Sequence, residues 1–312
     1  MISALNIKKK IKNEKKLCFC LIFSHFILYI PVTIKNDNDM MNFEKKAETM
    51  HEAIKSIKSS RTESDILTSV KDEFGCIYST DGLRLIKMTD SKVKSYTVKD
   101  TVQVICDNAF SDCKQLRTIE LPNSLITIGL KAFANCRMLR NVTLPQSLQH
   151  IATHAFEECH SLKSITIPQS VKVISYNAFA HCSKLTNVDI QAQIDFIPAM
   201  CFHSCTSLKS VSLPHSLSTI GCNAFGSCTS LAEIELPHKL NTIFPSAFIS
   251  CTALHEIHIP QSVTNIPANC FARCTSLENI YLQNPTTEID PTAFAYTKKV
   301  KKQYINKISV IN

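Results

Sequence analysis

Tryptophan is absent from the sequence, and only 5 glycines occur in 312 residues. Loops that bind phosphate groups through their backbone need several closely spaced glycines, and no such loop occurs. The G-x-S-x-G pattern of serine hydrolases and the H-E-x-x-H pattern of zinc peptidases are also missing. These absences favour a non-enzymatic binding protein, for which we expect no catalytic residue, no metal ion and no cofactor.

Charge is distributed unevenly along the chain. Residues 1–99 hold 18 Lys and Arg against 12 Asp and Glu, and residues 100–297 hold 11 against 14. The tail, residues 298–312, holds five lysines and no acid. A nucleic-acid-binding domain needs a basic surface on its folded part. The acidic balance of the long middle segment therefore argues against a nucleic-acid partner.

Phenylalanine recurs at a fixed interval of 23 residues, without insertion or deletion, at Phe110, Phe133, Phe156, Phe179, Phe202, Phe225, Phe248, Phe271 and Phe294. Cysteine keeps the same interval three positions later, at eight positions from Cys113 to Cys274. A period this short and regular is typical of a stacked solenoid, in which each unit buries its apolar side against its neighbours. The repeat therefore predicts the architecture.

One side of each unit has the pattern of a β-strand. Ile119 and Leu121 alternate with the polar Glu120, and Pro122 follows at once. Alternation is the pattern of a half-buried strand, and proline ends strand pairing because it has no N–H group. Since the pattern recurs in each unit, we expect a parallel sheet with neighbouring strands about 4.8 Å apart along one face.

The return side of each unit has apolar residues spaced three or four apart. In the unit that follows Ile128 these are Ala132, Phe133, Cys136 and Leu139. This spacing predicts a short helical or 3₁₀ turn. The complete expectation is an α/β solenoid, a horseshoe or rod with a parallel sheet on one face and short helical turns on the other.

Two motifs resemble a known repeat family. Leu116-x-x-Ile119-x-Leu121-Pro122 resembles the strand of a leucine-rich repeat, and Ala-Phe-x-x-Cys-x-x-Leu on the return side resembles the BspA-like class. Residues 75–86, with Asp81-Gly82 at a turn, are similar to the hairpin that often precedes the first repeat of this family. The resemblance covers roughly residues 74–297.

The BspA-like class includes surface antigens of oral bacteria and of protozoan parasites such as Trichomonas and Entamoeba. The resemblance therefore implies a cell-surface or secreted protein that binds host or matrix macromolecules, most directly proteins, and we expect it to be a monomer. The last unit departs from the pattern: Thr297, Val300 and Gln303 stand where cysteine, leucine and isoleucine are expected. Terminal repeats are usually atypical, so this unit reads as the C-terminal cap.

The sequence divides into five segments. A lysine-rich flank and an apolar segment form residues 1–34, a polar linker follows at 35–66, and residues 67–99 form an N-terminal cap with a hairpin. The repeats occupy 100–297, and residues 298–312 form a basic tail.

The N-terminal segment allows two interpretations. A basic flank before the apolar residues 17–34 is typical of a signal peptide or a membrane anchor, which would place the repeats outside the cytosol. Alternatively, translation begins at Met40 or Met41, and the protein is a cytoplasmic interaction scaffold.

The repeated cysteines favour packing over cross-linking. All eight occupy the same position of the unit, so we expect their side chains to point together into the core, where free cysteine behaves as a small apolar residue. The total of 15 is odd and fits no closed set of disulfides.

The exposed face of the predicted strands is the candidate binding surface. It grades from basic residues in early repeats to acidic residues in late ones, and a bipolar charge pattern can orient a protein partner. The candidate residues are Arg117, Glu120, Arg140, Lys163, Asp189, Lys209, Glu233, Glu235, Glu256, His258, Glu278 and Tyr281.

Overall fold

The computed structural model describes residues 17–23, 26–32, 59–298 and 300–304. The chain separates into two compact units, Met1–Glu52 and Ala53–Asn312. In the first unit, β1 (Leu17–Phe23) and β2 (Phe26–Val32) form an antiparallel pair. Nowhere in the described ranges does a helix have the length and apolar character needed to cross a bilayer. The lysine-rich flank, most of the expected linker and the end of the basic tail lie outside the described residues.

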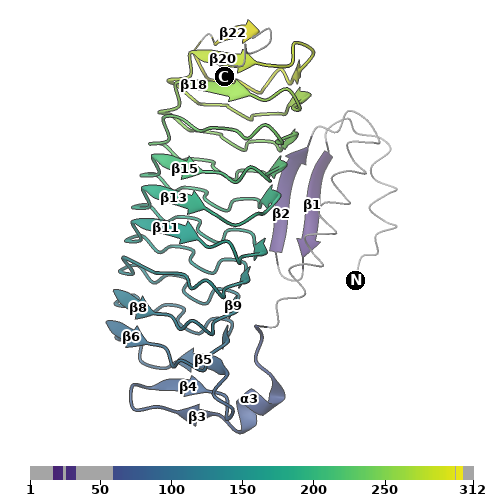
Figure 1. Ribbon diagram of the computed structural model, residues 1–312. Helices are drawn as coiled ribbons and strands as arrows, with labels where there is room; N and C mark the ends of the chain where they lie inside the picture. The colour runs from purple at the N-terminus through teal and green to yellow at the C-terminus, as the bar shows by residue number, and fades with distance from the viewer. Residues whose placement is uncertain (1–16, 24–25, 33–58, 299, 305–312) are drawn as a thin grey trace, which may run out of the picture. The chain divides into compact units, whose positions relative to one another are not determined.

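The second unit is a solenoid of about nine turns, which are stacked in sequence order (Figure 1). Its longer strands pair in parallel, and as far as β20 each residue lies opposite the one 23 positions later, as Ile165 lies opposite Val188. This confirms the predicted parallel sheet, although it is divided into shorter sheets. Its strands are β6 (Ser95–Thr97), β8 (Thr118–Glu120), β11 (Ser164–Ile167), β13 (Asn187–Ile190), β15 (Ser210–Ser212), β18 (Glu256–Ile259), β20 (Asn279–Leu282) and β22 (Lys301–Tyr304).

A second parallel row of strands, which the sequence did not predict, follows the turn after each longer-strand position, which carries proline in most units. These strands have two residues each, such as the pair Thr127–Ile128, and they keep the same register of 23 residues. They are β7 (Val104–Ile105), β9 (Thr127–Ile128), β10 (His150–Ile151), β12 (Val173–Ile174), β14 (Phe196–Ile197), β16 (Thr219–Ile220), β17 (Thr242–Ile243), β19 (Asn265–Ile266) and β21 (Glu288–Ile289).

The expected helical or 3₁₀ face is wrong. The return side of each described repeat consists of consecutive turns. In eight repeats, two positions four residues apart have positive φ, and among the described residues of the last repeat only Tyr296 does. In one of the eight repeats the two positions are Asn135 (φ 61°) and Lys131 (φ 53°). A left-handed residue at such short intervals interrupts a right-handed helix. Apolar residues recur three or four positions apart because the side chains of successive turns all point into one core.

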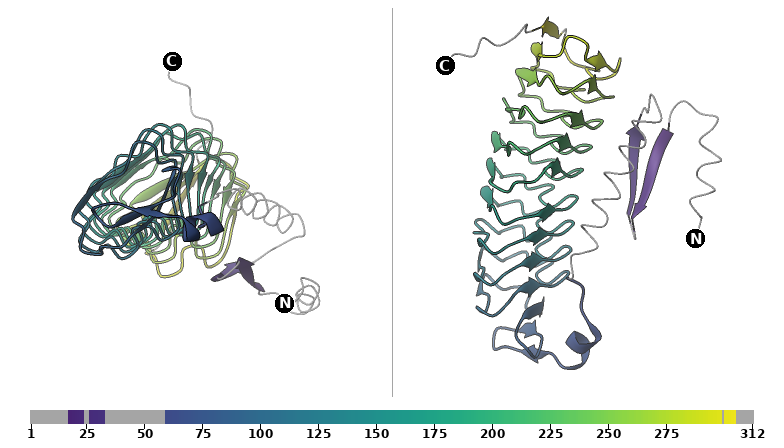
Figure 2. Two further views of the ribbon diagram at one scale, coloured as in Figure 1. Left: turned by 90° about the horizontal axis from the view of Figure 1, so that it is seen from below. Right: turned by 45° about the vertical axis from the view of Figure 1, so that its right-hand side comes forward.

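Backbone hydrogen bonds explain why turns replace a helix. The N–H of Phe133 donates to the carbonyl of Ala155 in the next repeat (2.8 Å), and the N–H of Asn135 donates to the carbonyl of Glu157 (2.8 Å). In an α-helix these groups would bond within their own segment. Here they join neighbouring repeats instead, so the return side is held along the axis of the stack. Seen along that axis, the turns superimpose around one interior (Figure 2).

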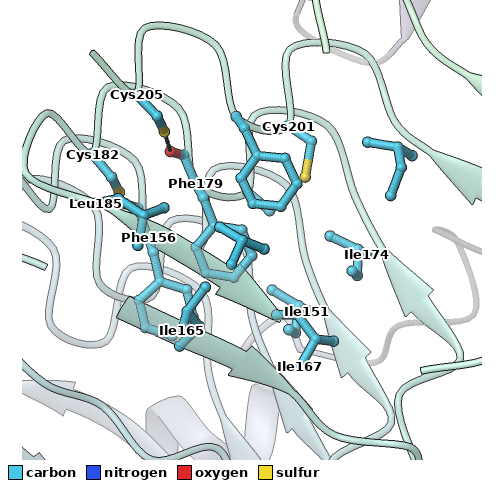
Figure 3. Packing of buried hydrophobic residues seen from close by; sticks show 14 of the residues in the cluster. Ile151, Phe156, Ile165, Ile167, Ile174, Phe179, Cys182, Leu185, Cys201 and Cys205 are labelled. Carbon is cyan, nitrogen blue, oxygen red and sulfur yellow. Dashed lines mark hydrogen bonds between the residues drawn. The ribbon is translucent and has the colours of Figure 1, made fainter. Parts of the chain in front are cut away.

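The interior is built from ladders of identical side chains (Figure 3). The nine repeated phenylalanine rings stack with centroids 5.1–5.6 Å apart and interplanar angles of 3–11°. Phe156 and Phe179 are fully buried, and Ile165 of the strand lies beside Phe156. Because each ring stacks on the rings of adjacent repeats, the ladder couples the stability of each repeat to that of its neighbours.

The cysteines form a second ladder beside the rings. The thiol of Cys205 donates a hydrogen bond to the carbonyl of Phe179 (3.2 Å), and the thiol of Cys182 donates likewise to Phe156 (3.2 Å). Burial raises the pKa of both thiols. The cysteines from Cys76 to Cys274 are all free and buried, which confirms that the ladder is packed and not cross-linked.

The segment before the first repeat contains α3 (Glu63–Leu67), which begins within the expected linker, and β3 (Val70–Lys71), β4 (Cys76–Tyr78) and β5 (Arg84–Met88). Strands β4 and β5 are antiparallel, which confirms the hairpin expected around Gly82 (φ 70°). The Tyr96 hydroxyl donates to Asp72 (2.6 Å) and also contacts the Tyr78 hydroxyl. A polar network thus joins the hairpin to strand β6.

The last turn of the solenoid departs from the regular interval by one residue. Strand β22 pairs with β20 so that Ile280 lies opposite Lys302, whereas the regular interval would place Gln303 there. Gln303 is exposed and its side-chain amide donates to Asn279 (3.0 Å). The expectation that Gln303 takes the isoleucine position is therefore wrong, because the last turn is one residue shorter.

Candidate binding surface on the strand face

Three columns of side chains make up the strand face, which is the outer surface of the longer strands. The leading column lies two residues before the first inward residue of each strand, and the second and third columns lie on either side of that inward residue. In the repeat of β11 (Ser164–Ile167) these positions are Lys163, Ser164 and Thr166, all exposed, while Ile165 is buried.

The leading column is held by backbone hydrogen bonds from repeat to repeat. The N–H of Arg117 donates to the carbonyl of Lys94 (2.8 Å), and the N–H of Arg140 donates to that of Arg117 (3.1 Å). The series continues through Lys163 and Thr186 to Lys209, with distances of 3.2, 2.8 and 2.9 Å. Successive side chains are therefore one strand spacing apart, about 4.8 Å.

Five of these six positions carry a cation, and we call Lys94, Arg117, Arg140, Lys163 and Lys209 the basic ladder. Lys94 was not among the candidates predicted from the sequence, although it lies 23 residues before Arg117 and the repeat interval alone identifies it. All five side chains are exposed. Within the described part of the chain, the ion pairs of lysine and arginine involve Arg84, Lys114 and Arg137, and none involves the ladder.

Two candidate acids lie beside the basic ladder in the third column. Glu120 is exposed, and its carboxylate accepts a hydrogen bond from the Thr97 hydroxyl (2.9 Å). Asp189 is half-buried and accepts from the Gln191 amide (2.8 Å). Both carboxylates are thus held by neutral partners, and neither forms an ion pair with the ladder in the described residues.

The late repeats present acids and aromatic rings. Glu233, Glu235, Glu256 and Glu278 are exposed. The rings of His258 and Tyr281 stack with centroids 4.4 Å apart and an interplanar angle of 16°. His258 Nε2 lies 3.5 Å from Glu256 Oε1.

The two halves of the strand face are separated by a local break. Among the described residues, no backbone hydrogen bond links Ala232 to Lys209, although the bonds resume from His255 to Ala232 (3.2 Å) and from Glu278 to His255 (2.9 Å). The segment around Glu233 and Glu235 also forms no strand. The change from basic to acidic character therefore coincides with a break in the leading column.

No described residues form a group of three or more histidine, cysteine, aspartate or glutamate side chains suited to a metal ion. The histidines that occupy the same turn position in adjacent repeats, His215 and His238, have ring centroids 6.4 Å apart. The strand face presents charged side chains, hydrogen-bonding groups and one stacked pair of rings.

The family model for the BspA type leucine-rich repeat region matches residues 88–209 and 196–312, in six copies. The chain belongs to the BspA-type leucine-rich-repeat family. This agrees with the repeat geometry, because the matched residues contain the strand face and the phenylalanine and cysteine ladders.

Solved structures of bacterial leucine-rich-repeat proteins are similar to this chain. A protein from Bacteroides ovatus is 29% identical, with a TM-score of 0.66, over 76% of this chain and 69% of that one. A leucine-rich cell surface protein from Faecalibacterium prausnitzii is 21% identical, with a TM-score of 0.38, over 78% and 96% of the two chains. The pneumococcal vaccine antigen PcpA is 19% identical, with a TM-score of 0.42, over 69% and 64%. No curated protein matches the sequence.

Proposed function

We propose that this BspA-type repeat protein is a non-enzymatic binding module that engages macromolecules through its strand face, as a cell-surface or secreted adhesion protein. The observation that carries the proposal is the basic ladder followed by the acidic late repeats on one exposed surface. Complementary charge on a partner would fix its orientation and accelerate its association.

The rigidity of the surface supports this role. The strand face is built on backbone hydrogen bonds and on buried residues such as Ile165 and Ile257, so its side chains are presented from fixed positions. A preorganised surface loses little conformational entropy on binding. Export is supported by the lysine-rich flank before the apolar residues 17–34, which is the pattern of a targeting segment.

Binding is tested with the purified full chain on immobilised matrix proteins such as fibronectin, laminin and collagen. In a late-face variant, Glu233, Glu256 and Glu278 are each replaced by lysine; in the matched control, the exposed acids Asp112, Asp195 and Glu288 are replaced in the same way. We expect the late-face variant alone to lose binding of at least one matrix protein. If both variants bind equally well, the strand face is not the binding surface.

A cytoplasmic scaffold beginning at Met40 or Met41 is the second candidate. The free cysteines between Cys76 and Cys274 favour it, because reduced thiols persist in reducing compartments. A C-terminal tag on intact cells separates the two candidates. Labelling of the tag without permeabilisation supports the adhesion protein, whereas labelling only after permeabilisation, with a mature N-terminus at Met40 or Met41, supports the scaffold.

A further inference from the structure

We infer that the basic ladder is a binding site for a linear sulfated polysaccharide that lies along the solenoid, across the strands. The inference rests on the proposed use of the strand face and names the ligand chemistry of its first half. The ladder spans five intervals of about 4.8 Å, or roughly 24 Å. Its cations, from Lys94 to Lys209, are in single file and free of ion pairs within the described residues.

The arrangement fits a linear polyanion because the cations project from one column whose backbone is joined by hydrogen bonds from repeat to repeat. Like charges at this spacing repel each other, and a ligand that places anionic groups along the same line removes that repulsion. A sulfated polysaccharide carries several anionic groups on each disaccharide, so each ladder cation can meet one. Arginine adds paired donors suited to sulfate oxygens at Arg117 and Arg140.

The columns beside the ladder fit sugars better than a protein. In the second column, the six residues that accompany it are neutral hydrogen-bonding side chains: Ser95, Thr118, Asn141, Ser164, Asn187 and Ser210. Sugar hydroxyl groups can exchange hydrogen bonds with such side chains. Protein interfaces instead depend on aromatic or apolar anchors, and none lies in the three columns between Lys94 and Ser212.

A nucleic acid fits the same surface less well. Proteins that bind single strands combine a basic groove with aromatic side chains on which the bases stack, and this part of the strand face has no exposed aromatic ring. If a duplex lay on the ladder, its second phosphate strand would also face the acids Glu120 and Asp189 in the third column. A single polysaccharide chain can follow the leading column alone.

The test measures binding of the full chain to heparin at about 0.15 M salt, since lysines elsewhere in the chain also attract polyanions. In the ladder variant, Arg117, Arg140 and Lys163 become serine; in the matched control, the exposed Lys172, Lys184 and Lys239 become serine. We expect the ladder variant to bind heparin about 10-fold more weakly and to show a shallower dependence on salt, with the control unchanged. An equal loss in both variants, or a loss in neither, would overturn the inference.

Three further probes identify the ligand class: hyaluronan, which carries carboxylates but no sulfate, poly-glutamate, and a single-stranded oligonucleotide. Ladder-dependent binding that is strongest for heparin supports the inference. Ladder-dependent binding that is as strong or stronger for poly-glutamate or the oligonucleotide assigns the ladder to an acidic protein or a nucleic acid and overturns it. The late-face variant keeps the ladder, so its loss of matrix-protein binding with unchanged heparin binding separates this inference from the proposed function.

Discussion

Two sets of columns run along the solenoid at the same interval of 23 residues, one facing the core and one facing solvent. The core columns keep their chemistry, as the rings from Phe110 to Phe271 are all fully buried. The strand-face columns keep their geometry but change from cations to acids and rings. The comparison shows that packing fixes the residue type only where neighbouring repeats must interlock, which leaves the outer surface free to carry recognition.

The largest effect is expected where a core column is interrupted in the middle of the stack. Phe179→Ala removes a fully buried ring that stacks on Phe156 and Phe202, and should lower the free energy of unfolding by about 3–5 kcal/mol. Phe294 is only partly buried at the end of the ladder, so Phe294→Ala should cost less. Urea denaturation followed by circular dichroism measures both, and equal losses would contradict the nearest-neighbour account.

A smaller loss is expected in the cysteine ladder. Cys182→Ala removes the thiol that donates to the Phe156 carbonyl and leaves a buried acceptor without its partner, at a cost of about 1–3 kcal/mol. Cys201→Ala is the matched control, because Ala178 and Ala224 hold the same position in the adjacent repeats. Denaturation midpoints of the two variants should differ, and a greater loss for the control would show that the hydrogen bond contributes little.

His203 places a titratable side chain next to the core, which should make the stability of the fold depend on pH. Burial, together with the nearby His181, lowers the pKa of His203, and its Nδ1 is buried with no hydrogen-bond partner among the described residues. The unfolded chain therefore binds the proton first, near pH 6.5. The stability that neutral His203 contributes is complete above that pH and is lost as the pH falls toward the lower folded pKa.

His203→Ala introduces the residue that Ala180 supplies in the preceding repeat. We expect this variant to lose less stability than the parent protein between pH 7 and about 5. Thermal melts across that range measure the difference. Parallel curves for the two proteins would show that His203 becomes protonated without opposing the fold.

The smallest effect on stability is expected on the strand face. The ladder variant, with serine at Arg117, Arg140 and Lys163, should unfold within about 0.5 kcal/mol per substitution of the parent, because these side chains are exposed and form no ion pairs with described residues. Urea denaturation is again the measurement. A loss comparable to that of Phe179→Ala would mean that the outer columns contribute to the fold.

Much of this architecture was predictable by counting residues. The interval of 23, the inward alternation of Ile119 with Glu120, the buried cysteines and the N-terminal hairpin all follow from local pattern, and the structure confirms them. The interval of 23 residues also locates the candidate strand-face positions, and the same interval leads from Arg117 back to Lys94. Local pattern succeeds here because each repeat has the same neighbours.

The features that counting missed depend on contacts between repeats. A strand of two residues such as Thr127–Ile128 has too few residues for a recognisable alternation and is defined only by its pairing with Val104–Ile105 and His150–Ile151. The return turns imitate helical spacing, because their amides donate to the next repeat. The one-residue slip of β22 likewise depends on how the last turn closes against β20.

The sequence by itself determined the repeat, the parallel stacking and the buried ladders, since these follow from which side chains must avoid water. It also determined the order of charges along the strand face, which is their order in the chain. Only the tertiary structure decided that the return side is made of turns and that a second row of strands exists. It also decided that the cations of the leading column are joined by backbone hydrogen bonds as far as Lys209, where the series breaks. The physical reason is that a backbone amide has several possible acceptors, and only the stacked neighbour selects one of them.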